Sequence, residues 1–274
     1  MTVNRGPRRE KGDERMQDVD LDALAQRVNE HQRKGLAMRK LTLEYPELTV
    51  EQAYRIQALA VERELAAGDR LIGWKMGLTS RAKQVSVGVD EPIYGRLLGA
   101  MELKTPILSV TGLVHPRVEP ELALVLKGRL EGDSITPRDV WRATECVVPA
   151  LEVIDSRYEN FSFTLVDVVA DNASSSRFYL GEQGFSPYHT QWDEVGVVVR
   201  KNGTVVQTGA GAAVLGHPVR SVVMLAQMLA REGLALEPGM VILTGGITEA
   251  VSVAPGDRLQ VAFDGLATLE LRVE

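Results

Sequence analysis

The sequence predicts an α+β protein in which a strand-rich domain with a curved, mixed sheet core follows a small helical N-terminal subdomain. Helical periodicity dominates up to about residue 70, and after it short apolar or alternating runs separated by glycine, proline and Asn-Gly turns dominate. The first 17 residues carry many charges and few apolar side chains, which is typical of a disordered leader. We therefore expect a leader over residues 1–17, a helical subdomain over 18–70 and a β-rich domain over 71–274.

Composition excludes several classes of protein. The 274 residues can bury a substantial core, and 45% hydrophobic and 25% charged residues are ordinary for a soluble globular chain. A net charge of −6 without a long Lys/Arg run argues against nucleic acid as a partner, and the lack of a long apolar stretch argues against a membrane or a signal peptide. The lone Cys146, beside two valines, predicts a buried structural thiol and suits a reducing compartment. We expect a cytoplasmic protein.

Two helices are expected in the N-terminal subdomain. The first follows Asp20 as its N-cap and carries apolar residues at helical spacing through Val28. The second begins with the capping-box pattern of residues 49–52 and runs to Gly68. Neither helix carries a motif that indicates chemistry.

The first strand of the β-rich domain is apolar except for one cation, Lys75. Side chains alternate along a strand, so Trp74 and Met76 point away from Lys75, which shares its face with Gly73 and Gly77. These small neighbours leave room beside the ammonium for a ligand. A lysine that simply reaches solvent is the alternative, and the residues alone leave both interpretations open.

An acidic stretch over residues 115–126, whose second half is typical of a strand, is the centre of the predicted chemistry. Glu119 and Glu121 project from the same face, and Glu152 is the only charge in an apolar run that forms a later strand. A Glu-x-Glu pair is often only the solvated face of a strand, but an apolar strand offers Glu152 no water. Three carboxylates predict an oxygen-ligand site for Mg²⁺ or Mn²⁺ and do not suit Zn²⁺.

The middle of the chain adds a helix start and a polar turn. Thr136 and Pro137 begin a short helix. Residues 166–177 are typical of a strand that runs into a polar turn with three consecutive serines, 174–176. Such serines usually mark a loop or a helix start, although their hydroxyls and backbone amides could also hold a carboxylate. No histidine stands nearby in the sequence, so a serine nucleophile is not indicated.

The C-terminal third alternates strands with tight turns and one helix. An Asn-Gly turn at residues 202–203 and an Asp-Gly turn at 264–265 each predict a pair of strands. A helix is expected over 217–233, with proline in its first turn and glycine at its end. Residues 241–246 form a buried strand that opens into a glycine pair, where a ligand can approach the backbone. The glycine-rich run 209–216 lacks the lysine of a P-loop, which argues against nucleotide binding.

Several of these motifs, in this order, resemble the hydratase/decarboxylase family of the fumarylacetoacetase-like superfamily. Its members include 2-hydroxypentadienoate hydratases and 4-oxalocrotonate decarboxylases. The resemblance extends from about residue 20 to the end of the chain, and the segments that carry it are residues 73–79, 118–121, 151–158, 170–175, 209–218 and 244–248. It implies a fumarylacetoacetase-like mixed β-roll fold for the catalytic domain, residues 71–274.

The resemblance also implies roles for individual residues. Glu119, Glu121 and Glu152 would hold Mg²⁺ or Mn²⁺, and Lys75 would act at the substrate. Substrate oxygens would also be contacted by Ser174, Thr244 and Gly245. The substrate would be a small 2-oxo-enedioate. A homo-oligomer or a complex with a vinylpyruvate hydratase is the assembly that the resemblance suggests.

Ile93 favours the decarboxylase branch of the family. The hydratases usually carry an acidic residue just before the aromatic position that Tyr94 occupies here. A hydratase needs an acid or base to activate water, whereas a decarboxylase benefits from keeping water away from the reacting carbon. Residues 156–161 and the triple serine also resemble the decarboxylases.

We therefore expect metal-dependent decarboxylation of 2-oxohex-3-enedioate (4-oxalocrotonate) to 2-hydroxypenta-2,4-dienoate and CO₂, in the meta-cleavage catabolism of aromatics. Hydration of 2-hydroxypenta-2,4-dienoate is the first alternative. A non-catalytic partner subunit of such a hydratase is the second, although the intact acidic residues and lysine argue against it. Hydrolysis of a C–C bond would need a water-activating His–Glu pair, and the sequence shows no obvious one near the motifs.

Overall fold

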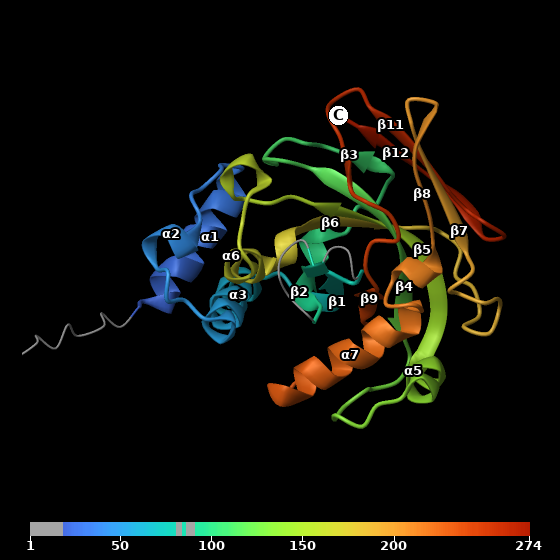
Figure 1. The fold of residues 1–274 in the computed structure, drawn as a ribbon, viewed down its shortest axis with the longest axis horizontal. Helices are drawn as coiled ribbons and strands as arrows, with labels where there is room; N and C mark the ends of the chain where they lie inside the picture. The colour runs from blue at the N-terminus through green and yellow to red at the C-terminus, as the bar shows by residue number, and fades with distance from the viewer. Residues whose placement is uncertain (1–18, 81–83, 86–90) are drawn as a thin grey trace, which may run out of the picture.

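The computed structural model describes residues 19–80, 84–85 and 91–274, so the predicted leader over residues 1–17 lies outside the described part of the chain. Two sheets form the body of the molecule, with a group of helices at one end and a long helix beneath (Figure 1). The expected α+β class is confirmed.

A seven-stranded mixed sheet carries the centre of the fold. Its strands run in the order β2-β1-β9-β4-β5-β6, and β10 pairs with β4. The strands are β1 (Leu71–Gly77), β2 (Ile93–Leu98), β4 (Arg117–Leu126), β5 (Thr144–Ile154), β6 (Ser175–Leu180), β9 (Val241–Leu243) and β10 (Val251–Ser252). Strands β1 and β9 are parallel, whereas β4 is antiparallel to both β9 and β5. The two longest strands, β4 and β5, therefore lie side by side in the middle of the sheet.

A five-stranded sheet covers one side of this body, in the order β3-β12-β11-β7-β8. Its strands are β3 (Ile107–Leu108), β7 (Gly196–Lys201), β8 (Thr204–Ala210), β11 (Arg258–Phe263) and β12 (Ala267–Val273). The Asn-Gly turn joins β7 to β8 and the Asp-Gly turn joins β11 to β12, which confirms both predicted strand pairs. Apolar residues alternate with polar ones along β11 and β12, so one face of this sheet is buried and the other is exposed.

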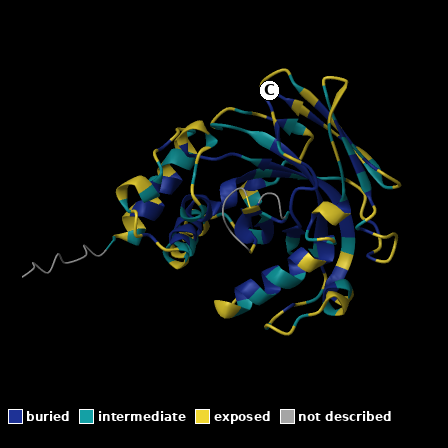
Figure 2. Ribbon diagram, viewed as in Figure 1, coloured by how far each residue is buried: buried dark blue, intermediate teal, exposed yellow. Residues whose placement is uncertain are grey.

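The main apolar core lies between the two sheets and the helix α7 (Pro218–Arg231), whose inner side is buried in Figure 2. His217 is the N-cap of α7, since its Nδ1 accepts the backbone N–H of Val219 at 3.1 Å, so the predicted helix and its start are confirmed. Residues 211–231 are long and apolar enough to cross a membrane, but half of this apolar stretch is buried inside the protein, as in a core helix.

The N-terminal helices build a second core. They are α1 (Leu21–Lys34), α2 (Leu41–Glu44) and α3 (Val50–Ala66). Asp20 caps α1, and Thr49 and Gln52 form the predicted capping box of α3. Their apolar faces pack together and also against Ile93, Tyr158 and α6 (Leu165–Ala170). The division of the chain into two domains at residue 70 stays a prediction. Residues after position 70 also contribute side chains to this helical core.

One predicted strand was wrong. Residues 165–170 form α6, not a strand, because Thr164 and Asp167 make a reciprocal capping box that opens a helix despite the β-branched residues that follow. The predicted helix after Thr136 is confirmed as α5 (Pro137–Ala143), which also has a capping box. Short 3₁₀ turns complete the fold: η1 (Gly99–Met101), η2 (Glu159–Phe161), η3 (Asn172–Ser174) and η4 (Gly211–Ala213). Cys146 is half-buried rather than fully buried, and burial raises the pKa of its thiol.

Candidate metal centre and active site

Three carboxylates meet on one face of the seven-stranded sheet. The register of β4 against β5 places Glu119 directly opposite Glu152, and Glu121 lies two residues further along β4 on the same face. One oxygen from each carboxylate lies within 4.8 Å of the others. The opposite face of β4 carries the apolar residues of the main core, so the acidic face is available for a site.

The three carboxylates are buried, with 7% of Glu119 and none of Glu121 or Glu152 exposed. The Oε1 atoms of Glu121 and Glu152 have no hydrogen-bond partner among the described residues. A buried ionised oxygen without a partner is costly, so these atoms call for a cation. Hard carboxylate oxygens at this separation are the donors that Mg²⁺ and Mn²⁺ prefer, and the chain therefore fits such an ion.

The turn after β9 holds two of these carboxylates in place. The Gly245 N–H donates to Oε2 of Glu121 at 2.7 Å, and a Cβ on Gly246 would lie only 2.7 Å from the carboxyl group of Glu119. Gly245 has φ of +116°, and a Cβ there would meet Thr79 Oγ1 at 2.2 Å. Only glycine fits these two positions, which explains the glycine pair in the sequence.

Lys75 reaches the acidic cluster from β1. Its Nζ lies 3.0 Å from Glu152 Oε2 and donates to the Ala173 carbonyl at 3.2 Å, with 3% of the residue exposed. A Cβ on Gly77 would lie 3.7 Å from Nζ, so this glycine does leave room beside the ammonium. Gly73 does not leave room for a ligand: the carbonyl of Val241 on β9 would lie 1.9 Å from a Cβ there, so this glycine allows the close approach of β9. Lys75 does not reach solvent, and this alternative is excluded.

Charge balance within the cluster sets the protonation of its members. Burial alone would lower the pKa of Lys75, but the nearby carboxylates, Glu152 first, outweigh it, so the pKa of the ammonium is raised and the lysine is charged. Burial raises the pKa of Glu121 well above its usual range, and the charge of Glu152 adds to this effect. The pKa of Glu152 is also raised by burial, although Lys75 opposes the shift. The cluster thus contains more negative than positive charge, and a divalent cation would supply the missing positive charge.

A strained turn, residues 171–174, forms the wall beside Lys75. Asn172, Ala173 and Ser174 all have φ near +50°, which is uncommon for residues other than glycine. The buried Arg157 donates to the side chain and carbonyl of Asp171 and fixes the start of the turn. The turn presents the Ser174 hydroxyl, which is buried and has no hydrogen-bond partner among the described residues.

A pocket of about 350 Å³ opens beside the cluster. Lys75, Glu119 and Ser174, all buried, belong to its lining. Its remaining described lining is largely apolar, with a few polar residues: Gly77, Leu78, Ile93, Arg117, Ile154, Phe161, Phe163, Val168, Ala173, Glu249 and Ala250. A small organic acid fits a cavity of this size and character.

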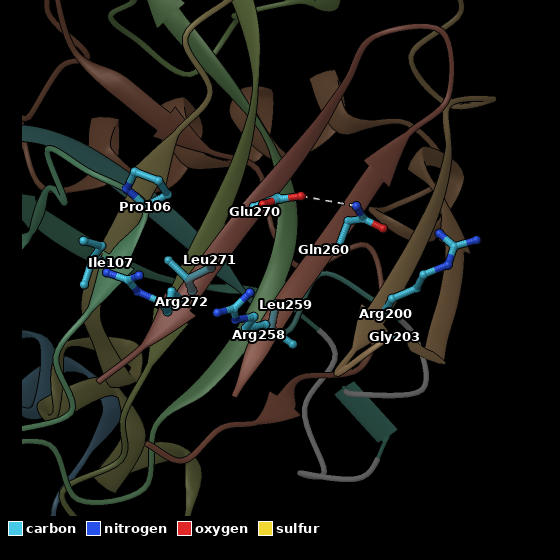
Figure 3. Close-up of a pocket in the computed structure, with 10 residues that line it drawn as sticks. All are labelled: Pro106, Ile107, Arg200, Gly203, Arg258, Leu259, Gln260, Glu270, Leu271 and Arg272. Carbon is cyan, nitrogen blue, oxygen red and sulfur yellow. Dashed lines mark hydrogen bonds between the residues drawn. The ribbon is translucent and has the colours of Figure 1, made fainter. Parts of the chain in front are cut away.

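A larger hollow of about 550 Å³ lies elsewhere, on the outer face of the five-stranded sheet. Figure 3 shows its polar lining, with Arg200, Arg258 and Arg272 around the hydrogen-bonded pair of Gln260 and Glu270. The acidic cluster does not line this hollow, and the side chain of Arg272 is 53% exposed. The smaller pocket is therefore the candidate active site.

Of the three residues predicted to contact substrate oxygens, only Ser174 is among the described residues that line the pocket. Ser174 lines the pocket, whereas the Thr244 hydroxyl donates to the Leu122 carbonyl at 2.7 Å and Gly245 contacts Glu121. Contact between substrate and Thr244 or Gly245 stays a prediction. The sequence reasoning missed Arg117, although it stands two residues before Glu119 on the same strand face and could have been found from that spacing. It also missed Phe161, for which no local signal exists.

Comparisons with known proteins show what the chain is similar to. The model of the fumarylacetoacetate (FAA) hydrolase C-terminal family matches residues 98–274. A 4-oxalocrotonate decarboxylase of Pseudomonas putida is 45% identical over 251 residues, which cover 91% of this chain and 95% of the relative. A 2-hydroxypent-2,4-dienoate hydratase of Pseudomonas putida is also 45% identical, over 193 residues that cover 69% and 86%. The structure of the 4-oxalocrotonate decarboxylase from Pseudomonas putida G7, complexed with magnesium and adipate, matches with a TM-score of 0.90 and 44% identity over 93% of this chain and 97% of that one.

Proposed function

The chain belongs to the fumarylacetoacetate hydrolase family, and we propose that within it the protein is a Mg²⁺- or Mn²⁺-dependent decarboxylase of 2-oxohex-3-enedioate (4-oxalocrotonate). The products are 2-hydroxypenta-2,4-dienoate and CO₂. The observation that carries this proposal is the buried cluster of three carboxylates and a charged lysine beside a mainly apolar pocket, which Glu119 and Lys75 line.

Glu119, Glu121 and Glu152 would hold the cation, since one oxygen of each converges on the same point. The Oε1 atoms of Glu121 and Glu152 also lack a hydrogen-bond partner among the described residues. A divalent cation there would supply Lewis acidity toward the C1 carboxylate and C2 oxo oxygens of the substrate. Gly245 keeps Glu121 in position through its N–H. A solved relative contains magnesium together with adipate, a saturated dicarboxylate with the same number of carbons as the proposed substrate.

Lys75 stabilises the charge that develops at the C2 oxygen. Cleavage of the C5–C6 bond releases CO₂, and its electron pair moves through the C3–C4 double bond onto that oxygen, which gives a dienolate. One proton then completes 2-hydroxypenta-2,4-dienoate. The Lys75 ammonium is buried and charged beside the pocket, so it can pair with the oxygen and supply this proton. Ser174 offers a further hydroxyl donor in the lining of the same pocket.

The pocket wall favours decarboxylation over hydration. Ile93, 4% exposed, stands beside Gly77 and Lys75. The family resemblance implies an acidic residue at this position in the hydratases. With Phe163 and Val168, Ile93 lines the pocket with surface that excludes water. A hydratase also reaches 45% identity, but over 69% of this chain against 91% for the decarboxylase, and the apolar wall supports the same assignment.

A steady-state assay of CO₂ release from 2-oxohex-3-enedioate, with Mg²⁺ or with excess chelator, tests the proposal. We expect release only with Mg²⁺ or Mn²⁺, and recovery when the metal is restored. Metal-independent release would refute the role of the three carboxylates. Addition of water to 2-hydroxypenta-2,4-dienoate without CO₂ release would assign the protein to the hydratase branch.

We further propose a setting for the reaction. A small 2-oxo-enedioate is the partner that the pocket accommodates, and cytoplasmic catabolism of aromatic compounds is where such acids arise. The product is the substrate of a vinylpyruvate hydratase, so a complex with that enzyme, or a homo-oligomer, is the assembly to test by gel filtration and co-purification.

A further inference from the structure

Arg117 lies in the same pocket as Lys75 and Glu119. It is the first residue of β4, where its backbone pairs with Ile154 of β5 and with Ser252 of β10. Its side chain therefore extends from the sheet face that carries the acidic cluster, two residues before Glu119.

The spacing along β4 separates the base of Arg117 from that of Glu119 by a distance comparable to the length of the substrate. Two residues of a strand span about 6.6 Å, so the base of the Arg117 side chain lies about that far from the base of Glu119. The extended chain of a six-carbon diacid spans about 6 Å, from five carbon–carbon bonds of about 1.5 Å in a zigzag. A diacid with C1 and C2 at the acidic cluster can thus direct C6 toward Arg117.

The guanidinium group of Arg117 is held by an aromatic ring and is not paired with a carboxylate of the described residues. It stacks on the ring of Phe161, with Cζ 3.8 Å from the ring centroid. Stacking fixes the plane of the guanidinium and leaves its N–H edge able to bind a carboxylate through two hydrogen bonds. No carboxylate pairs with Arg117 among the described residues, whereas Lys75, the other cation in the described pocket lining, is already paired with Glu152.

We infer that Arg117 binds the C6 carboxylate of the substrate and thereby selects a diacid over a monoacid, a role that depends on the proposed function. The electrostatic preference has to come from Arg117, because Lys75 is paired with Glu152 and the exposed Glu249 of the pocket lining would repel a carboxylate. The product lacks this carboxylate, so the same contact favours exchange of product for new substrate.

Two saturated ligands isolate this contact. 2-Oxoadipate has both ends of the substrate but no C3–C4 double bond, so it offers no electron path for decarboxylation, and 2-oxohexanoate lacks only the distal carboxylate. Calorimetry with Mg²⁺-saturated protein gives the ratio of their dissociation constants. We expect wild type to prefer 2-oxoadipate by about 10- to 100-fold, the range for hydrogen bonds to charged groups. Arg117→Met should reduce the preference below about 3-fold and leave 2-oxohexanoate binding unchanged, and Arg117→Lys should restore part of it.

Arg258→Met is the matched control, because Arg258 lies on the outer face of the five-stranded sheet (Figure 3) and should leave the ratio at the wild-type value. An unchanged ratio in Arg117→Met, or an equal loss of affinity for both ligands, would overturn the inference in favour of a structural role. Equal affinities of the wild type for 2-oxoadipate and 2-oxohexanoate would refute the role of Arg117 but not the binding of C1 and C2 at the metal site. If neither ligand binds in a Mg²⁺-dependent way, the proposed function fails, and the inference fails with it.

Discussion

Replacement of Glu121 by glutamine should stabilise the metal-free protein. Glu121 is fully buried, and the charges that act on it are Glu152 and Glu119, which repel it, and Lys75, which attracts it. At an effective dielectric constant of about 20, two unit charges 4.8 Å apart interact by about 3.5 kcal/mol. One repulsion thus remains after Lys75 compensates the other, unless Glu121 takes up a proton, and the raised pKa of Glu121 reflects this cost of its charged form. The amide of glutamine removes this repulsion and still accepts the Gly245 N–H.

The hydrogen bond from Gly245 is weaker to an amide than to a carboxylate, so we expect a net stabilisation of about 2 kcal/mol. For a chain of this size that raises the Tm by about 4 to 8 °C in chelator. Mg²⁺ at one hundred times its Kd stabilises the wild type by about 2.7 kcal/mol, and it should leave Glu121→Gln nearly unchanged because a ligand is lost. The order of the two melting temperatures should therefore reverse between chelator and Mg²⁺.

Thermal denaturation followed by circular dichroism, in chelator and in Mg²⁺, measures both effects. Glu145→Gln is the control, because Glu145 is an exposed residue on the same strand as Glu152 and should change neither value. A lower melting temperature of Glu121→Gln in chelator would show that the carboxylates are not in net repulsion. An equal response of Glu121→Gln and wild type to Mg²⁺ would show that Glu121 is not a ligand.

Three further results are expected. Lys75→Met should lower kcat for CO₂ release by at least ~100-fold, and a loss of under 3-fold would contradict charge stabilisation by the ammonium. Ser174→Ala should lower kcat/KM by about 10-fold without loss of stability in urea, since the hydroxyl has no partner among the described residues. Burial raises the pKa of Asp171 from 3.8 to about 6 although Arg157 opposes this, so the folded state binds a proton that the unfolded state releases. The stability of wild type relative to Asp171→Asn should then fall by roughly 1 kcal/mol per pH unit between about pH 4 and 6, and a constant difference in urea midpoints would refute the shift.

The sequence by itself determined the features that depend on neighbouring residues. Alternation along a strand placed Glu119 and Glu121 on one face, and the cap residues Asp20 and Thr49 located the starts of two helices. The apolar run around Glu152 predicted its burial, which the structure confirms. These features follow from backbone periodicity and from hydrogen bonds within one turn, so the local sequence carries them.

Tertiary structure decided everything that depends on pairing between distant segments. The register of β4 against β5 sets Glu119 opposite Glu152, and no pattern within either strand specifies it. The position of Phe161 under Arg117 and the carbonyl of Ala173 beside Lys75 likewise come from segments far away in the chain. Residues 165–170 have a β-branched composition that favours a strand, yet a helix cap and packing against α3 made them a helix. The free energy gained by burying an apolar face between two elements exceeds the local preference for strand or helix. Only the folded chain shows which faces pack together.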